Sequence, residues 1–145
     1  MKDVLLREVC DFSEADYRTV CHFLKQLSEM PRVLTIESFK ELIEAPQSHL
    51  LILESNEKTI GMITIAVYPV PTGRKAWVED VVIDSSFRGE GLGRCLLEQA
   101  LDYSRQVLQV DSLLLTSRPS RIAANALYRT LGFQQRETNV YKMNL

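Results

Sequence analysis

Apolar residues follow two different periods along this chain, and each period predicts one kind of element. Short apolar or β-branched runs bounded by turn residues are typical of strands. They predict strands at residues 4–9, 49–54, 59–68, 75–83, 112–116 and 140–143. Apolar residues spaced three and four positions apart are typical of helices. They predict helices from Ser13 to before Pro31, from Thr35 to Ala45, from Gly91 to Val107 and from Ser120 to Leu131.

Two of these helices carry residues that favour helix ends. Ser13 and Asp16 fit a capping box, in which a hydroxyl and a carboxylate accept from otherwise unpaired backbone amides. Gly132 follows the last predicted helix, where a glycine readily takes the left-handed conformation that ends a helix. The elements are thus expected in the order β-α-α-β-β-β-α-β-α-β.

This order indicates the fold class. Meandering strands followed by a β-α-β crossover favour an α+β fold with a mixed, mostly antiparallel twisted sheet flanked by helices. The 145 residues match the length of one domain. No repeat or linker divides them, so we expect a single domain over residues 1–145.

Composition narrows the classes of partner. The formal net charge is −2, so we expect neither a nucleic acid nor an anionic membrane as partner. No apolar stretch approaches the roughly 20 residues of a membrane-spanning helix. The three cysteines form no C-x-x-C pair, and His22 and His49 have no ligand spacing. We therefore expect a cytoplasmic protein with no metal.

The segment between the fourth predicted strand and the third predicted helix reads Arg-Gly-Glu-Gly-Leu-Gly-Arg at residues 88–94. Glycines let a ligand approach the backbone closely, and a helix N-terminus presents free amides to an anion. Arg88 and Arg94 add two positive charges suited to phosphate oxygens. The dinucleotide pattern G-x-G-x-x-G fails, because its sixth position holds Arg94 or Leu96. A Walker loop is absent from the sequence.

The pattern R-x-x-G-x-G, with Arg88, Gly91 and Gly93, resembles the acetyl-CoA-binding motif of the GNAT superfamily of N-acetyltransferases. The preceding strand, residues 77–84, resembles the central strand that leads into that motif. Residues 125–128 and 131–133 resemble the family's closing helix and turn. The resemblance covers about residues 50–135, and it implies a GNAT-like fold with acetyl-CoA as co-substrate.

The resemblance also implies which residues contact the coenzyme. The pantetheine arm would pair with the strand backbone, and the loop would hold the pyrophosphate, while an asparagine and a tyrosine of the closing helix would approach the arm and the sulfur. The implied coenzyme residues are Val81, Val82, Ile83, Arg88, Gly89, Glu90, Gly91, Leu92, Gly93, Arg94, Asn125 and Tyr128. Each also has a plainer reading, as a buried strand, a helix start, a surface asparagine or a core tyrosine.

Two residues match catalytic positions of the family. Tyr128 matches the acid that serves the departing thiolate, and Glu79 matches a position whose carboxylate often takes the proton of the amine. Glu79 and Asp80 are adjacent on a strand, so they point to opposite faces unless a bulge intervenes. Whether Glu79, Asp80 or a chain of waters acts as the base stays open. A backbone amide near Val82 is the hypothesis for the oxyanion donor.

The expected function is therefore acetyl transfer from acetyl-CoA to a primary amine of a small molecule or peptide, by direct attack in a ternary complex. The alternative is a catalytically weak coenzyme A-binding sensor or regulator of the same fold. The acceptor stays open, since the segment at residues 29–33 that is expected to line its pocket carries little information. The oligomeric state stays open as well, with a homodimer among the family's options.

Overall fold

The computed structural model describes residues 3–145 and divides the chain into two compact units, which we describe separately. The first unit extends to Leu115 and the second comprises Thr116–Leu145. The single domain expected over residues 1–145 stays a prediction.

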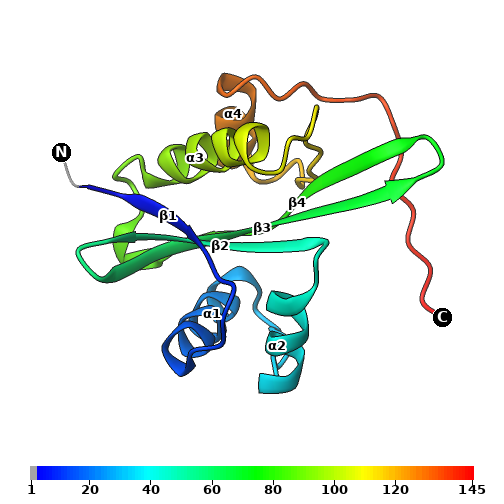
Figure 1. The fold of residues 1–145 in the computed structure, drawn as a ribbon. Coiled ribbons are helices and arrows are strands. Elements are labelled where there is room, and N and C mark those ends of the chain that lie inside the picture. Colours follow the sequence, from blue (N-terminus) through cyan, green and yellow to red (C-terminus); the bar gives the residue numbers. More distant parts are fainter. Residues whose placement is uncertain (1–2) are drawn as a thin grey trace. The chain divides into compact units, whose positions relative to one another are not determined.

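A four-stranded antiparallel sheet forms the middle of the first unit (Figure 1). Its strands lie in sequence order and are β1 (Leu5–Glu8), β2 (Ser48–Ser55), β3 (Lys58–Val70) and β4 (Gly73–Ile83). Asn56 and Glu57 have φ angles of 49° and 63°, which match the tight primed turn that joins strands with a right-handed twist. The first four predicted strands are thereby confirmed.

Helices cover both faces of this sheet (Figure 1). α1 (Glu14–Leu27) and α2 (Ile36–Glu44) lie on one face, and α3 (Leu92–Gln106) lies on the other. Ser13 caps α1 by accepting from the Asp16 amide at 3.0 Å. The Asp16 carboxylate binds Arg7 of β1 at 2.9 Å, so this part of the predicted capping box instead ties α1 to the sheet.

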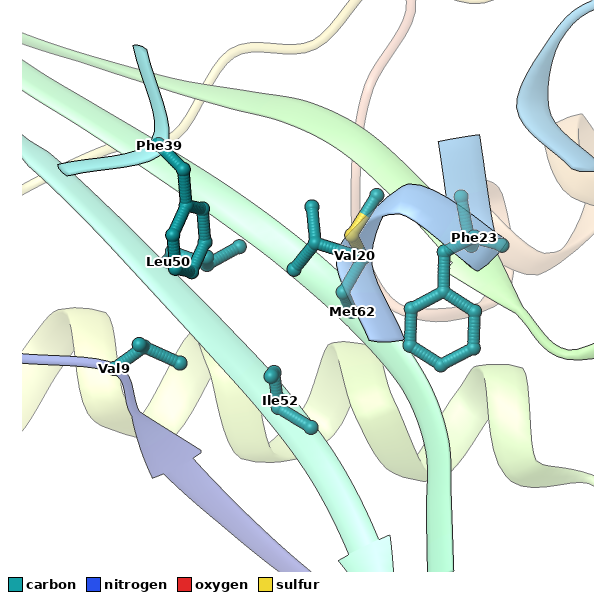
Figure 2. Close-up of a cluster of buried hydrophobic side chains, with 8 residues drawn as sticks. Val9, Val20, Phe23, Phe39, Leu50, Ile52 and Met62 are labelled. Atoms are coloured by element: carbon teal, nitrogen blue, oxygen red, sulfur yellow. The ribbon is translucent and has the colours of Figure 1, made fainter. Parts of the chain in front are cut away.

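A cluster of buried hydrophobic side chains lies between the sheet and the first two helices (Figure 2). Alternate β2 side chains point to opposite faces, so Leu50 and Ile52 join this core while Leu51 and Leu53 are buried on the other face. Eight buried side chains make up the cluster between the sheet and the two helices: Val9, Val20, Phe23, Phe39, Leu50, Ile52, Met62 and Val82. Burial on both faces explains why β2 reads as a continuous apolar run.

The second unit contains α4 (Ile122–Thr130) and a C-terminal segment. α4 ends as the sequence predicts, because Gly132 has a φ of 98°. The Gly132 amide donates to the Arg129 carbonyl at 3.1 Å, and the Phe133 amide donates to the Tyr128 carbonyl at 3.0 Å. These two bonds form a Schellman motif, which satisfies carbonyls at the helix end.

Two predicted strands differ in the structure. Residues 112–116 form only an isolated parallel bridge, between Leu114 and Trp77, and residues 140–143 form no strand. Val140 and Tyr141 are 76% and 88% exposed. An apolar, β-branched pattern favours a strand only where a neighbouring strand supplies its hydrogen bonds, and the pattern alone does not reveal that neighbour. The α+β class is confirmed.

Candidate active site

A β-bulge interrupts β4 beside the two carboxylates identified in the sequence. Met62 pairs with Val82 and Thr64 pairs with Glu79, so two β4 residues, Asp80 and Val81, stand opposite one β3 residue. Asp80 has a φ of 49°, in the left-handed region that aspartate tolerates better than most residues. The extra residue breaks the alternation of the strand, and both Glu79 and Asp80 are exposed.

This arrangement changes the acidity of both carboxyl groups. Neighbouring protein atoms displace part of the water around the carboxyl group of Glu79, and this desolvation raises its pKa. The nearby negative charge of Asp80 raises the pKa of Glu79 further. Partial burial also raises the pKa of Asp80. A carboxyl group with a raised pKa holds a proton more strongly, so it is better suited to accept one from an amine near neutral pH.

The glycine loop leads from β4 into α3 as the sequence predicts. Asp84 and a short 3-10 helix, Ser85–Phe87, follow β4, and α3 begins after its N-cap residue Gly91. Gly91 has a φ of 75° and Gly89 a φ of 81°, conformations that glycine adopts without strain. The Cβ of an alanine at either position would meet no atom within 4 Å, so the space beside these two glycines is open.

The N-cap residue of α3, Gly91, makes no side-chain cap hydrogen bond, and a helix N-terminus is a favourable place for an anion. Gly93 lies in the first turn of α3, where it adds no side chain that would cover the amides. Arg88 donates to the Ile83 carbonyl at 3.1 Å, and Arg94 pairs with Glu98 at 2.8 Å. The loop thus brings together a helix N-terminus, with the positive end of its dipole, and two arginines, groups of the kind that can bind a phosphate.

The strand that enters this loop packs closely against β3. Val82 is 4% exposed, while Val81 and Ile83 are half-buried. A Cβ on Gly61 of β3 would lie 2.4 Å from the Val82 carbonyl oxygen. Only glycine permits this approach, so Gly61 helps to fix the backbone of residues 81–83.

Asn125 and Tyr128 lie one turn apart on α4, in the second unit. The side-chain amide of Asn125 donates through Nδ2 to the Arg118 carbonyl at 2.9 Å and so supports the segment before α4. Tyr128 is 7% exposed, and its ring lies edge-on to Phe133 with 5.9 Å between the centroids. Both residues therefore have structural contacts in addition to the roles that the resemblance implies.

The sequence did not reveal a polar cluster at the start of the loop. His22 and Gln26 of α1 contact Asp84 and Ser85, respectively. Their one signal in the sequence is a polar pair, four residues apart, in the last two turns of an amphipathic helix. Within residues 3–145, no group of three His, Cys, Asp or Glu side chains could hold a metal ion. None of the helices in that range has the length and apolar content to span a bilayer.

Comparisons with known proteins identify the family of the chain. A family model described as "Acetyltransferase (GNAT) family" matches residues 10–133. N-alpha-acetyltransferase RimI of Mycobacterium tuberculosis is 29% identical over 98 residues, which are 68% of this chain and 60% of that protein. A [ribosomal protein bS18]-alanine N-acetyltransferase of Salmonella typhimurium is 39% identical over 61 residues, 42% of this chain and 40% of that protein.

A solved structure agrees over nearly the whole chain. The transcriptional regulator from Bacillus halodurans C-125 superimposes with a TM-score of 0.81 at 25% identity, covering 98% of this chain and 99% of that one. By contrast, the chain spans only 60%, 38% and 45% of the lengths of the first three curated relatives that it matches.

Proposed function

The chain belongs to the acetyltransferase (GNAT) family, and we propose that it transfers the acetyl group of acetyl-CoA to a primary amine. The observation that carries this proposal is that the carboxylate pair at the bulge of β4 lies a few residues before the glycine loop. A site for the proton of the amine and a site for a pyrophosphate thereby occupy one short stretch of backbone.

The proposed coenzyme site begins with the loop. Amides of the first turn of α3 would bind pyrophosphate oxygens, and the open space beside Gly89 and Gly91 supports this proposal. The backbone of Val81–Ile83 would pair with the pantetheine arm. Acetyl-CoA supplies an activated acetyl group as a thioester, and the residues of the chain hold and orient it.

Glu79 is the proposed base. An amine must lose a proton before or during its attack, and the raised pKa of Glu79 makes its carboxylate a better acceptor than an ordinary one. Asp80 or a bridging water could pass the proton on, since both carboxylates are exposed at the bulge. The negative pair also favours an acceptor that arrives as a cation.

Two further groups complete the proposed chemistry. The Val82 amide is proposed to stabilise the negative charge that develops on the carbonyl oxygen. Tyr128 is proposed as the acid because its place in the sequence matches the acid of the family. A phenol with a pKa of about 10 and a thiol of about 8.5 differ by roughly 2 kcal/mol in proton affinity. A hydrogen bond from Tyr128 would therefore serve the thiolate nearly as well as full protonation.

The proposed acceptor is the amino group of a peptide or of a small molecule. Relatives of this chain are named for N-alpha-acetylation and for acetylation of a ribosomal-protein alanine, which favours a peptide N-terminus as the first acceptor to test. The three cysteines are free, in keeping with the cytoplasmic location that we propose for this chemistry.

The experiment is a thiol-release assay with acetyl-CoA and a panel of amines. The panel contains peptides with free N-termini, the same peptides with blocked N-termini, polyamines, amino sugars and free amino acids. We expect release with at least one unblocked amine and none with its blocked counterpart. Binding of acetyl-CoA without release for any acceptor would support the sensor alternative, and failure to bind would contradict the proposed site.

A further inference from the structure

Two side chains of α1 reach the segment that connects β4 to the glycine loop. His22 Nε2 lies 2.9 Å from Asp84 Oδ2. One turn later, Gln26 Oε1 accepts from the Ser85 amide at 2.8 Å. These contacts join residues about 60 positions apart in the sequence, and both end just before the residues that are proposed to bind pyrophosphate.

Hydrogen-bond chemistry fixes the orientation of Gln26. The Ser85 amide is a donor, so the oxygen of the Gln26 side chain must face it, and the NH2 group then faces His22 at 2.9 Å. His22 Nε2 can donate to Asp84 or accept from Gln26, but a single ring nitrogen cannot do both at once. The protonation state of that nitrogen therefore decides which of the two partners His22 holds.

Asp84 is itself a fixed point in this segment. Its other oxygen, Oδ1, accepts from the Ser86 amide at 2.9 Å and from the Ser86 hydroxyl at 2.7 Å. These bonds, with a smaller contribution from His22, lower the pKa of Asp84 to about 2. Its amide donates to the Ile60 carbonyl at 2.8 Å. The entry to the loop is thus held to β3 by the backbone and to α1 by side chains.

The contacts of His22 and Gln26 with the loop entry add to the buried contacts that hold α1 in place. Phe23 and Val20 are 0% and 3% exposed and anchor the helix in the core, whereas the His22 side chain is 59% exposed. Removing a contact of an exposed side chain usually changes stability little. Loss of the exposed His22 side chain, or of the half-buried Gln26 side chain, should free the loop entry without releasing the helix, because Val20 and Phe23 still anchor α1.

We infer that His22 and Gln26 are positioning residues that hold the loop entry, through Asp84 and Ser85, in the conformation that binds the coenzyme. This inference rests on the proposed function, since it concerns the same coenzyme site. A loop held in its binding conformation pays less ordering entropy when the ligand arrives. The cluster would thus contribute to coenzyme affinity and leave the chemical step unchanged.

The test compares four variants by calorimetric binding of acetyl-CoA. His22→Ala and Gln26→Ala remove the contacts, and His22→Gln offers an amide that can still donate to Asp84. Lys25→Ala is the matched control, because Lys25 is an exposed residue of the same helical turn. We expect about 5- to 20-fold weaker binding for the two alanine variants, the loss of one or two such hydrogen bonds. We expect substantial rescue by His22→Gln and a control within about 2-fold of wild type.

Two further readouts separate positioning from a structural role. With the acceptor found in the amine panel, KM for acetyl-CoA should rise in the alanine variants while kcat stays within about 2-fold. In the free protein, amides of residues 85–91 should exchange with solvent faster in the alanine variants, while those of α1 keep their protection.

The outcomes distinguish the two proposals. If wild-type protein does not bind acetyl-CoA, the proposed function fails and the inference fails with it. If wild type binds and both alanine variants bind equally well, the function stands and the positioning role is refuted. A fall in kcat with unchanged affinity would also refute it, as would equal losses in the Lys25→Ala control.

Discussion

Replacing Gly61 by alanine tests how closely β3 must approach the strand that enters the coenzyme loop. The added Cβ would lie 2.4 Å from the Val82 carbonyl oxygen, 2.8 Å from Ile83 Cδ1 and 3.3 Å from Ile83 Cα. The Ile83 methyl group can rotate away, but the carbonyl oxygen belongs to the backbone. Ordinary contact begins at 3.4 Å, so the two strands would have to separate by about 1 Å at this point.

The size of the effect follows from two opposing contributions. Overpacking a well-packed site costs about 1–3 kcal/mol. Alanine restricts the unfolded chain more than glycine does, which returns about 0.4–1 kcal/mol. We therefore expect Gly61→Ala to lower the free energy of unfolding by roughly 1–2 kcal/mol, with a midpoint lower by about 2–8 °C. Displacement of Val82 and Ile83 should also weaken binding of acetyl-CoA.

Thermal and urea unfolding measure the first effect, and calorimetric titration with acetyl-CoA measures the second. Thr59→Ala, two residues earlier on β3, serves as a control that shortens a side chain on the same strand. A Gly61→Ala protein with wild-type stability and wild-type affinity would refute the argument that this close approach shapes the site.

Three further substitutions test other parts of the account. Glu79→Gln should lower kcat/KM and remove the acid limb of the pH profile of kcat/KM. The pKa of Glu79 is raised, so this limb should lie above the ordinary pH range of a glutamate. An unaltered pH profile would argue against Glu79 as the base. The folded protein holds this proton more tightly than the unfolded chain, so ionisation of Glu79 destabilises the fold as pH rises, and Glu79→Gln should not lower the unfolding midpoint at neutral pH. Tyr128→Phe should reduce kcat by about 10²- to 10⁴-fold with coenzyme affinity nearly intact in titrations, and full turnover would remove Tyr128 from the mechanism. Phe39→Ala should cost about 3–5 kcal/mol in urea unfolding, since Phe39 is 0% exposed and packs against Phe12 and Tyr17. A loss below about 1 kcal/mol would contradict the packing described, and Glu41→Ala, at an exposed position of the same helix, is the control.

The sequence predicted the elements that depend on local chemistry. The apolar runs of β2 and β3, the cap at Ser13 and the stop at Gly132 each follow from a few neighbouring residues, and the structure confirms them. The start of α3 after Gly91 is confirmed for the same reason, since a glycine-rich stretch before helical spacing defines both the turn and the helix.

Features that depend on pairing between distant residues could not be predicted in the same way. The bulge at Asp80 depends on how β4 aligns with β3, and a run of apolar residues is compatible with several alignments. The apolar pattern at residues 140–143 does not indicate which strand would pair with this segment. His22 and Asp84 are 62 positions apart in the sequence, so the sequence around either residue does not reveal that the two are in contact.

Single-turnover transfer of an isotopically labelled acetyl group shows whether the acetyl group moves from the coenzyme to an amine in one step. Protein in excess over labelled acetyl-CoA is mixed with the best amine from the panel, and the label is followed by mass spectrometry. We expect the label to leave the coenzyme and to appear on the nitrogen of the amine as free thiol forms, without passing through a labelled protein. Label that stays on the coenzyme with every amine, or that first accumulates on the protein, would contradict it.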